Sequence, residues 1–185
     1  MKRRDAVKKL LSNRKDLLVV AGLGSTAWDC TAAGDSPLTF PMWGAMGQAA
    51  MMGLGLALAQ PKRRVLVVTG DGEALMGLGA LATIGVQKPA NLTVVVIDNE
   101  RYGETGMQHT HTAHGVDLNG VAQACGFNVL EFEKVKSAIH SAKGPNFCAV
   151  KVQPEKIPLV LPPREGALLK ARFRRALFGP DADTE

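Results

Sequence analysis

The segment Val65–Gly103 reads VLVVTGDGEALMGLGALATIGVQKPANLTVVVIDNERYG, and it decides the fold. VLVVT and LTVVVI are uninterrupted apolar runs, which are typical of parallel strands buried on both faces. The Ala/Gly/Leu-rich interval between them is long enough for a helix that returns the chain to the same edge of a sheet. The segment therefore predicts an α/β fold with a mostly parallel sheet and helices on both faces.

The same alternation continues on either side of this segment. We expect strands at Leu17–Ala21, Val65–Thr69, Leu92–Ile97, Asn128–Glu131 and Phe147–Val152. We expect helices at about 44–60, 73–87, 117–125, 133–142 and 165–178. The first and last segments, about 2–15 and 165–178, are amphipathic and should dock on the outside. Three prolines, Pro158, Pro162 and Pro163, predict an extended crossing before the last helix.

Length and composition fit one globular domain. The 185 residues are 46% hydrophobic and 21% charged, which excludes a disordered chain and needs no metal or disulfide staple. Since no repeat or linker interrupts the chain, we expect a single domain over 1–185, with its core at about 17–155 and flanking terminal helices. Three widely spaced cysteines without a CxxC pair argue against a zinc site, a disulfide framework or a cysteine-ligated iron–sulfur cluster, and favour a cytoplasmic protein.

Two stretches could suggest other classes of protein. The net charge of +5 collects at the two ends of the chain, but stacking aromatics and nucleic-acid motifs are missing, so we interpret these ends as solvated helix faces. Residues Pro41–Gln60 carry no charge and are about long enough to span a membrane. Because they lead directly into a strand and an acidic turn, we interpret them as a buried core helix.

Polar residues follow two successive strands at the points where those strands end. Gly70-Asp71-Gly72 comes after VLVVT, and Asp98-Asn99 comes after LTVVVI. Ligands of open parallel sheets collect beyond the carboxyl ends of the strands, where carboxylate, amide and carbonyl oxygens suit Mg²⁺. A helix that begins near Glu73 would direct free N–H groups to the same place, which favours phosphate. Each motif alone is more commonly a turn, but together they predict a magnesium–diphosphate clamp.

The spacing of these motifs resembles that of a known family. Gly70-Asp71-Gly72, 26 intervening residues and Asn99 resemble the thiamine-diphosphate fingerprint. The segment Trp43–Gly85 resembles the cofactor-binding domain of thiamine-dependent 2-oxoacid decarboxylases. The continuation Val96–Thr112 is most similar to the β chain of sulfopyruvate decarboxylase and to phosphonopyruvate decarboxylase. The resemblance covers about residues 17–155 and implies the thiamine-diphosphate-binding fold, in its diphosphate-binding form.

The resemblance assigns roles to individual residues. It implies that Asp71 and Asn99 bind Mg²⁺ through their side chains and Arg101 through its carbonyl. It implies that Met46 lies beneath the cofactor and holds it bent, although a methionine there could also be plain core. The remaining residues implied to lie against the cofactor are Gly44, Gly70, Gly72, Glu73, Ala74, Tyr102 and Gly103.

The resemblance also implies that one catalytic group lies on another chain. In this family a Glu of a pyrimidine-binding domain activates the cofactor, and the present chain matches only the diphosphate-binding domain. We therefore expect a companion α subunit that carries the pyrimidine-binding domain, in an α₂β₂ or larger assembly, and no nucleic-acid or membrane partner.

The segment Glu104–His114 should face the substrate. Its polar side chains could bind a sulfonate or phosphonate, and His109 or His111 could protonate the carbanion left after decarboxylation, although incidental histidines in a solvent-facing loop are an equal alternative. The expected activity is decarboxylation of an anionic 2-oxoacid, 3-sulfopyruvate first. The alternatives are a phosphonopyruvate decarboxylase subunit, a carboligase of the acetolactate-synthase type and a non-catalytic cofactor-binding subunit.

Overall fold

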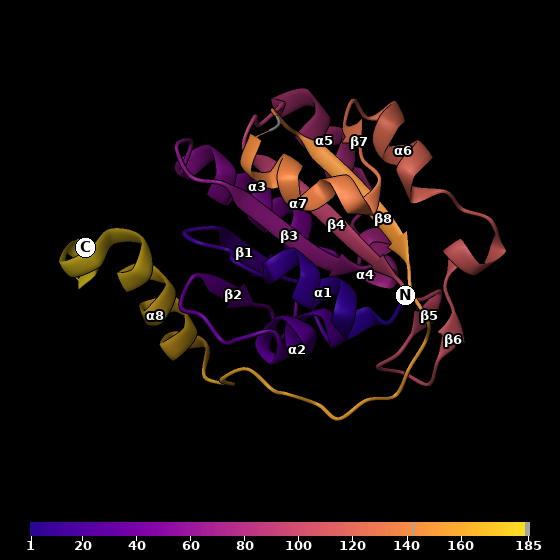
Figure 1. Ribbon diagram of the computed structural model, residues 1–185, viewed down its shortest axis with the longest axis horizontal. Coiled ribbons are helices and arrows are strands. Elements are labelled where there is room, and N and C mark those ends of the chain that lie inside the picture. Colours follow the sequence, from indigo (N-terminus) through magenta and orange to yellow (C-terminus); the bar gives the residue numbers. More distant parts are fainter. Residues whose placement is uncertain (142, 184–185) are drawn as a thin grey trace.

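A parallel sheet forms the centre of the computed structural model, which describes residues 1–141 and 143–183 (Figure 1). Its six strands are ordered β2-β1-β3-β4-β8-β7, and every neighbouring pair is parallel. The strands are β1 (Leu18–Ala21), β2 (Thr39–Pro41), β3 (Val65–Gly70), β4 (Leu92–Asp98), β7 (Asn128–Val129) and β8 (Asn146–Lys151). A separate antiparallel hairpin joins β5 (Arg101–Tyr102) to β6 (Gln108–His109).

Helices cover both faces of this sheet. They are α1 (Arg3–Leu11), α2 (Ser25–Ala32), α3 (Ala49–Ala59), α4 (Asp71–Met76), α5 (Gly79–Gln87), α6 (Leu118–Ala124), α7 (Phe132–Ser141) and α8 (Gly166–Phe178), with 3₁₀ turns η1 (His111–His114) and η2 (Gly179–Asp183). One hydrophobic cluster joins the sheet to α1, α2 and α7, and a second joins it to α3, α5, α6 and α8. The predicted fold class is confirmed.

The apolar runs in the sequence follow from these two layers. In β1, Val19 and Ala21 belong to the first cluster, whereas Leu18 and Val20 belong to the second. Because successive side chains of a strand point to opposite faces, a sheet covered on both sides buries every one of them. The five predicted strands are therefore present, with the strand predicted at Asn128–Glu131 shortened to two residues.

The structure also contains elements that the sequence did not predict. The edge strand β2 is only three residues long and ends in Pro41, so it lacks the apolar run that identifies a strand. Helix α2 is short and amphipathic only weakly, because it buries a polar pair, Thr26 and Asp29, beside its apolar residues. The hairpin of β5 and β6 has two residues in each strand.

Two predicted helices differ from the structure. The helix expected at 44–60 begins only at Ala49, because Ala45 (φ 57°) and Gly47 (φ 94°) adopt left-handed backbone conformations that end regular helix. The helix expected at 73–87 is divided into α4 and α5 at Gly77, whose backbone lies against that of Gly47 without room for a side chain. The last residue of the helix expected at 133–142 lies outside the described residues.

The interpretation of Pro41–Gln60 as a buried core helix is wrong for half of its surface. Gly53 lies against Val67 of β3 on the inner side of α3. On the outer side, however, Met52 is 38% exposed and Leu58 is 51% exposed. Helix α3 therefore presents an uncharged apolar surface to its surroundings. Within the described residues, no helix combines the length and apolarity that a membrane span requires.

The two termini are fastened to the sheet by specific contacts. In α1, the Arg3 and Arg4 guanidinium groups bind the buried Asp29 carboxylate of α2, at 2.5 and 3.0 Å. At the other end, Phe173 of α8 contacts the ring of Phe40 in β2 edge to face at 5.6 Å. Parts of the basic ends are thus paired or buried rather than solvated, which corrects that expectation.

An extended segment, residues 152–165, connects β8 with α8 as the prolines predicted (Figure 1). Two hydrogen bonds hold its course. Arg4 donates to the Pro158 carbonyl at 2.8 Å, and the Trp43 indole donates to the Pro163 carbonyl at 2.7 Å. The segment therefore passes close to the loop that precedes α3.

Candidate functional site

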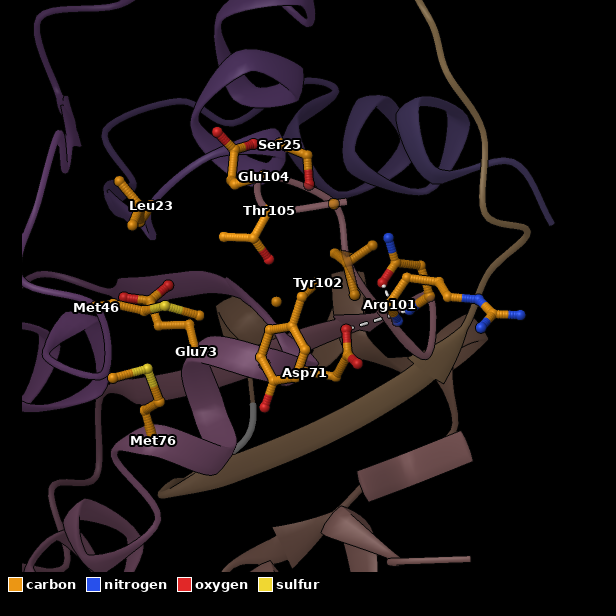
Figure 2. Close-up of a pocket in the computed structure, with 15 residues that line it drawn as sticks. Leu23, Ser25, Met46, Asp71, Glu73, Met76, Arg101, Tyr102, Glu104 and Thr105 are labelled. Atoms are coloured by element: carbon orange, nitrogen blue, oxygen red, sulfur yellow. Dashed lines mark hydrogen bonds between the residues drawn. The ribbon is translucent and has the colours of Figure 1, made fainter. Parts of the chain in front are cut away.

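A cavity of about 370 Å³ opens at the carboxyl ends of β1, β3 and β4 (Figure 2). The strand order reverses between β1 and β3, since β2 lies on one side of β1 and β3 on the other. Such a reversal leaves a crevice in which open α/β sheets bind ligands. The cavity is lined by Leu23, Ser25, Met46, Gly70, Asp71, Gly72, Glu73, Met76, Ile97, Asn99, Arg101, Tyr102, Gly103, Glu104 and Thr105.

The two predicted strand ends lie side by side in this cavity. Gly70 pairs with Ile97 in the β3–β4 ladder, so Asp71 and Asn99 follow from neighbouring strands. The Asn99 backbone N–H donates to Asp71 Oδ1 at 3.3 Å. The Asn99 side-chain oxygen accepts the backbone N–H of Arg101 at 3.0 Å, which turns the chain there. Oxygen atoms of the three residues predicted to bind the cation are thus carried by one small part of the fold.

Two buried threonines hold the far side of the Asp71 carboxylate. Thr110 donates its hydroxyl to Asp71 Oδ2 at 2.5 Å. Thr112 donates to Asp98 Oδ1 at 2.8 Å and lies 3.4 Å from Asp71 Oδ2. The Lys151 ammonium lies 2.9 Å from Asp98 Oδ2, so Asp98 has a cationic partner.

The charge of Asp71 is not neutralised in the same way. No ion pair involves its carboxylate within residues 1–141 and 143–183, although only 2% of the residue is exposed. Burial raises the pKa of Asp71, and the nearby Asp98 charge adds to that effect, while the Thr110 hydroxyl opposes it. A buried carboxylate without a cationic partner, with amide and carbonyl oxygens in the same part of the fold, is a donor set that could hold Mg²⁺.

The opposite end of the cavity is open and is lined by two methionines. Met46 and Met76 lie there, and the Tyr102 ring stands between them and Asp71 (Figure 2). A Cβ atom at Gly72 would lie 2.5 Å from the Tyr102 ring and 3.5 Å from the Met46 methyl group. Gly72 therefore leaves the space in which Tyr102 and Met46 meet the start of α4.

Glu73 places a second buried carboxyl group beside Met46 (Figure 2). Its Oε2 accepts the Thr69 hydroxyl at 2.7 Å, whereas Oε1 has no hydrogen-bond partner among the described residues. Burial raises the pKa of Glu73, and the Thr69 hydroxyl and the N–H groups of Ala49, Gly47 and Leu23 oppose this effect. The resemblance placed Glu73 against the cofactor but assigned no role to its side chain.

Several lining residues were not predicted. Leu23 and Ser25 follow β1, and a Gly-Leu-Gly-Ser sequence after an apolar run is a signal that could have identified this loop. Met76 and Ile97 also line the cavity. Conversely, Gly44 and Ala74, which the resemblance placed against the cofactor, are not among the lining residues.

The histidines of the predicted substrate segment lie away from the cavity. His109, His111 and His114 are exposed, and none of them lines it. Glu104 and Thr105 of the same segment do line it. Within this stretch the buried side chains are those of Thr110 and Thr112. The catalytic role predicted for His109 and His111 stays a prediction.

Three comparisons place this geometry among known proteins. Residues 24–152 match the family described as "Thiamine pyrophosphate enzyme, C-terminal TPP binding domain". The chain is 37% identical, over 99% of both chains, to sulfopyruvate decarboxylase subunit beta of Methanothermobacter thermautotrophicus. It is also 37% identical to phosphonopyruvate decarboxylase of Streptomyces viridochromogenes, where 97% of this chain matches 47% of that protein.

A solved structure has the same fold. It is a Mycobacterium smegmatis protein assigned to the thiamin diphosphate-dependent enzymes. The TM-score is 0.69 at 25% sequence identity, and the match covers 84% of this chain and 32% of that one. The match therefore spans about a third of that longer protein.

Proposed function

Because the chain belongs to the thiamine pyrophosphate enzymes, as their C-terminal TPP-binding domain, we propose that it is the β subunit of a decarboxylase dependent on thiamine diphosphate and Mg²⁺. The substrate we propose is an anionic 2-oxoacid, 3-sulfopyruvate, which would yield sulfoacetaldehyde and CO₂. The observation that carries the proposal is the buried Asp71 carboxylate, which has no cationic partner among the described residues and accepts the Asn99 N–H at the ends of β3 and β4.

Different residues of the chain would bind the cation and the diphosphate of the cofactor. Asp71 and Asn99 would bind the cation through side-chain oxygens, and Arg101 would bind it through its carbonyl. The backbone N–H groups of Gly72 and Glu73, which line the cavity at the start of α4, would face the diphosphate, with that of Ala74 next in the chain. When bound, such a cofactor supplies an electron sink for the carbanion left after CO₂ departs.

The open end of the cavity would receive the other half of the cofactor. Met46, which lines this end, would support it, and the carbonyl of Gly44, two residues earlier in the same loop, would accept a hydrogen bond from it. Support for this role comes from the left-handed Ala45 and Gly47, which turn the loop so that Met46 lines the cavity. Holding two reacting groups close together in this way lowers the barrier to proton removal.

The proposed site is completed by a companion α subunit. Met76 is 63% exposed where it lines the cavity, and α3 presents Met52 and Leu58 outward. Exposed apolar surface of this kind marks protein–protein contact. The relative from Methanothermobacter is named a subunit, and the Streptomyces relative is about twice as long as this chain. We propose that the companion carries the pyrimidine-binding domain and its activating Glu, in an α₂β₂ or larger assembly.

A second substrate has comparable support. Phosphonopyruvate is the alternative, because a phosphonopyruvate decarboxylase is as similar in sequence as the sulfopyruvate relative. Both substrates carry a tetrahedral anion next to a 2-oxoacid, and in this chain the exposed Thr105 and Gln108 could face such a group.

The decisive experiment measures decarboxylation by the purified chain alone, by its companion alone and by the mixture. Each is supplied with thiamine diphosphate, Mg²⁺ and one of sulfopyruvate, phosphonopyruvate or pyruvate. We expect CO₂ release only from the mixture, and fastest from sulfopyruvate. Turnover by this chain alone would contradict the half-site, and a preference for pyruvate would contradict the substrate. A mixture that binds cofactor without turnover would support a non-catalytic subunit.

A further inference from the structure

We propose that Thr110 and Thr112 are positioning residues that orient the Asp71 carboxylate so that only Oδ1 is free for the cation. The inference rests on the proposed cofactor site, but it concerns residues to which neither the fingerprint nor the comparisons assign a role. It also assigns a role to the two buried side chains of the 104–114 segment.

The hydroxyl groups are built into the interior. Thr110 is 0% exposed and Thr112 is 4% exposed, although the neighbouring His109 and His111 are exposed. The chain from 109 to 112 thus alternates outward imidazoles with inward hydroxyls. Because valine would fill nearly the same volume, the property that only threonine adds here is a hydrogen-bond donor.

Two hydroxyl protons serve two carboxylates. Thr110 donates to Asp71 Oδ2 at 2.5 Å, and Thr112 donates to Asp98 Oδ1 at 2.8 Å. The two hydroxyl oxygens lie 3.0 Å apart and thus stand between the acidic groups. On Asp71 this leaves Oδ1 with one long contact, the 3.3 Å Asn99 N–H. The free lone pairs of Asp71 are therefore on the atom beside Asn99, where the other proposed cation ligands lie.

The hydroxyls are themselves fixed by a second set of contacts. The Thr110 N–H donates to the Glu100 carbonyl at 3.1 Å, which closes the hairpin of β5 and β6 at its base. The Lys151 ammonium binds Asp98, Glu100 and the Thr112 carbonyl, at 2.9, 2.5 and 3.3 Å. The hairpin carries Gly103, Glu104 and Thr105, which line the cavity. Thr110 therefore connects the Asp71 carboxylate directly with the hairpin that carries this part of the cavity lining.

The test compares three variants of the full chain, alone and together with its companion. Thr110→Val removes the donor, Thr110→Ser keeps it, and Thr93→Val alters a buried threonine of β4 outside the cavity as the matched control. The measured quantity is the Mg²⁺ concentration that half-saturates thiamine diphosphate binding, by calorimetry. Partners of metal ligands typically change metal affinity 10–100-fold. We expect that change for Thr110→Val, and less than about threefold for Thr110→Ser and Thr93→Val.

A second readout separates positioning from a collapsed site. At saturating Mg²⁺, Thr110→Val should bind thiamine diphosphate as tightly as the wild-type chain, because only the cation site is weakened. Equal Mg²⁺ dependence of the wild-type and Thr110→Val proteins would overturn the inference while leaving the proposed function intact. If the wild-type protein fails to bind the cofactor both alone and together with its companion, the proposed function would instead be overturned. If Thr110→Val does not fold, Thr110→Cys, a weak donor of similar size, takes its place with the same expected outcomes.

Discussion

The two ends of the cavity are built in opposite ways. One end is the part proposed to hold the cation, called the cation end below. There Asp71, Asn99 and Thr110 are buried, and each has hydrogen-bond partners within the chain. At the open end, Met46 is half-buried and Met76 is largely exposed, and the side chains are mostly apolar. Polar groups that must act inside a protein are preorganised by their neighbours, whereas exposed apolar groups await a partner. This contrast agrees with our proposal that the chain forms one half of a site and that a companion subunit forms the other.

The largest effect should come from the cation end. Asp71→Asn removes the ionic ligand while keeping its size, and loss of one partner of a buried charge pair costs about 3–5 kcal/mol. We expect Mg²⁺-dependent binding of thiamine diphosphate to weaken on the order of 100–4,000-fold, measured by calorimetry. Unchanged binding would remove the cation from this end of the cavity and with it the contrast between the two ends.

The same substitution should stabilise the cofactor-free chain. Burial raises the pKa of Asp71 and of Glu73 above their ordinary values of 3.8 and 4.5. Their contribution to stability is therefore fully present below those values and is lost as the pH rises through the higher pKa values of the folded state. We expect Asp71→Asn to reduce this loss and to raise the neutral-pH Tm by about 2–4 °C per kcal/mol recovered. A Tm that falls at neutral pH would contradict this account of Asp71.

At the open end, Met46→Ala should affect turnover more than binding. The side chain lines the cavity without a polar contact, so its loss changes the shape of the bound cofactor rather than its anchorage. Small misplacements of reacting groups can cost about 100-fold in rate. We expect a loss of that order in kcat of the complete enzyme, with affinity for the cofactor changed less than about tenfold. Equal losses in both quantities would make Met46 an ordinary binding contact.

Gly72 lies where the two ends meet, and its substitution should have an intermediate effect. In Gly72→Ala the new methyl group would displace the Tyr102 ring, which is half-exposed and can move toward the cavity. Overpacking of this kind costs about 1–3 kcal/mol, so we expect cofactor affinity to fall roughly tenfold. The paired variant Gly72→Ala/Tyr102→Ala should recover most of the loss. No recovery would show that the glycine serves the backbone itself.

The smallest effect on the isolated chain should come from Met52→Lys on the outer side of α3. Exposed substitutions usually change stability by less than about 0.5 kcal/mol, and we expect an unchanged Tm. Association with the companion, measured by analytical ultracentrifugation, should weaken, because the lysine would bring a charge into an apolar contact. Lys62→Met, just beyond α3, exchanges the same two residue types in reverse and serves as the control. Unchanged association would place the contact elsewhere.

The sheet was the predictable part of this molecule. Runs such as VLVVT and LTVVVI are long and buried on both faces, so their local pattern suffices to identify them. The edge strand β2 and helix α2 were not predicted, because tertiary contacts rather than a local sequence pattern stabilise them. The three residues of β2 take their place from pairing with β1, and α2 from the buried Asp29 that binds Arg3 and Arg4.

The site was predictable where residues follow directly from strand ends. Asp71 and Asn99 needed only the parallel register of β3 and β4 to meet. The inward turn of Thr110 and Thr112, by contrast, depends on a hairpin with two residues in each strand, which leaves no periodic signal. The histidines beside them drew attention because of their chemistry, although the backbone turns them outward. Side-chain direction in a short loop is set by the chain packed behind it, which the sequence does not reveal locally.

Both borders of the sheet are too short to recruit another strand. On one border β2 has three residues and carries α8 against it, and on the other β7 has two. Short edge strands of this kind disfavour edge-to-edge pairing of sheets into aggregates. We therefore expect contacts between subunits to be made by helices and loops. Contacts of this kind can rearrange around a bound coenzyme without breaking the backbone hydrogen bonds between strands.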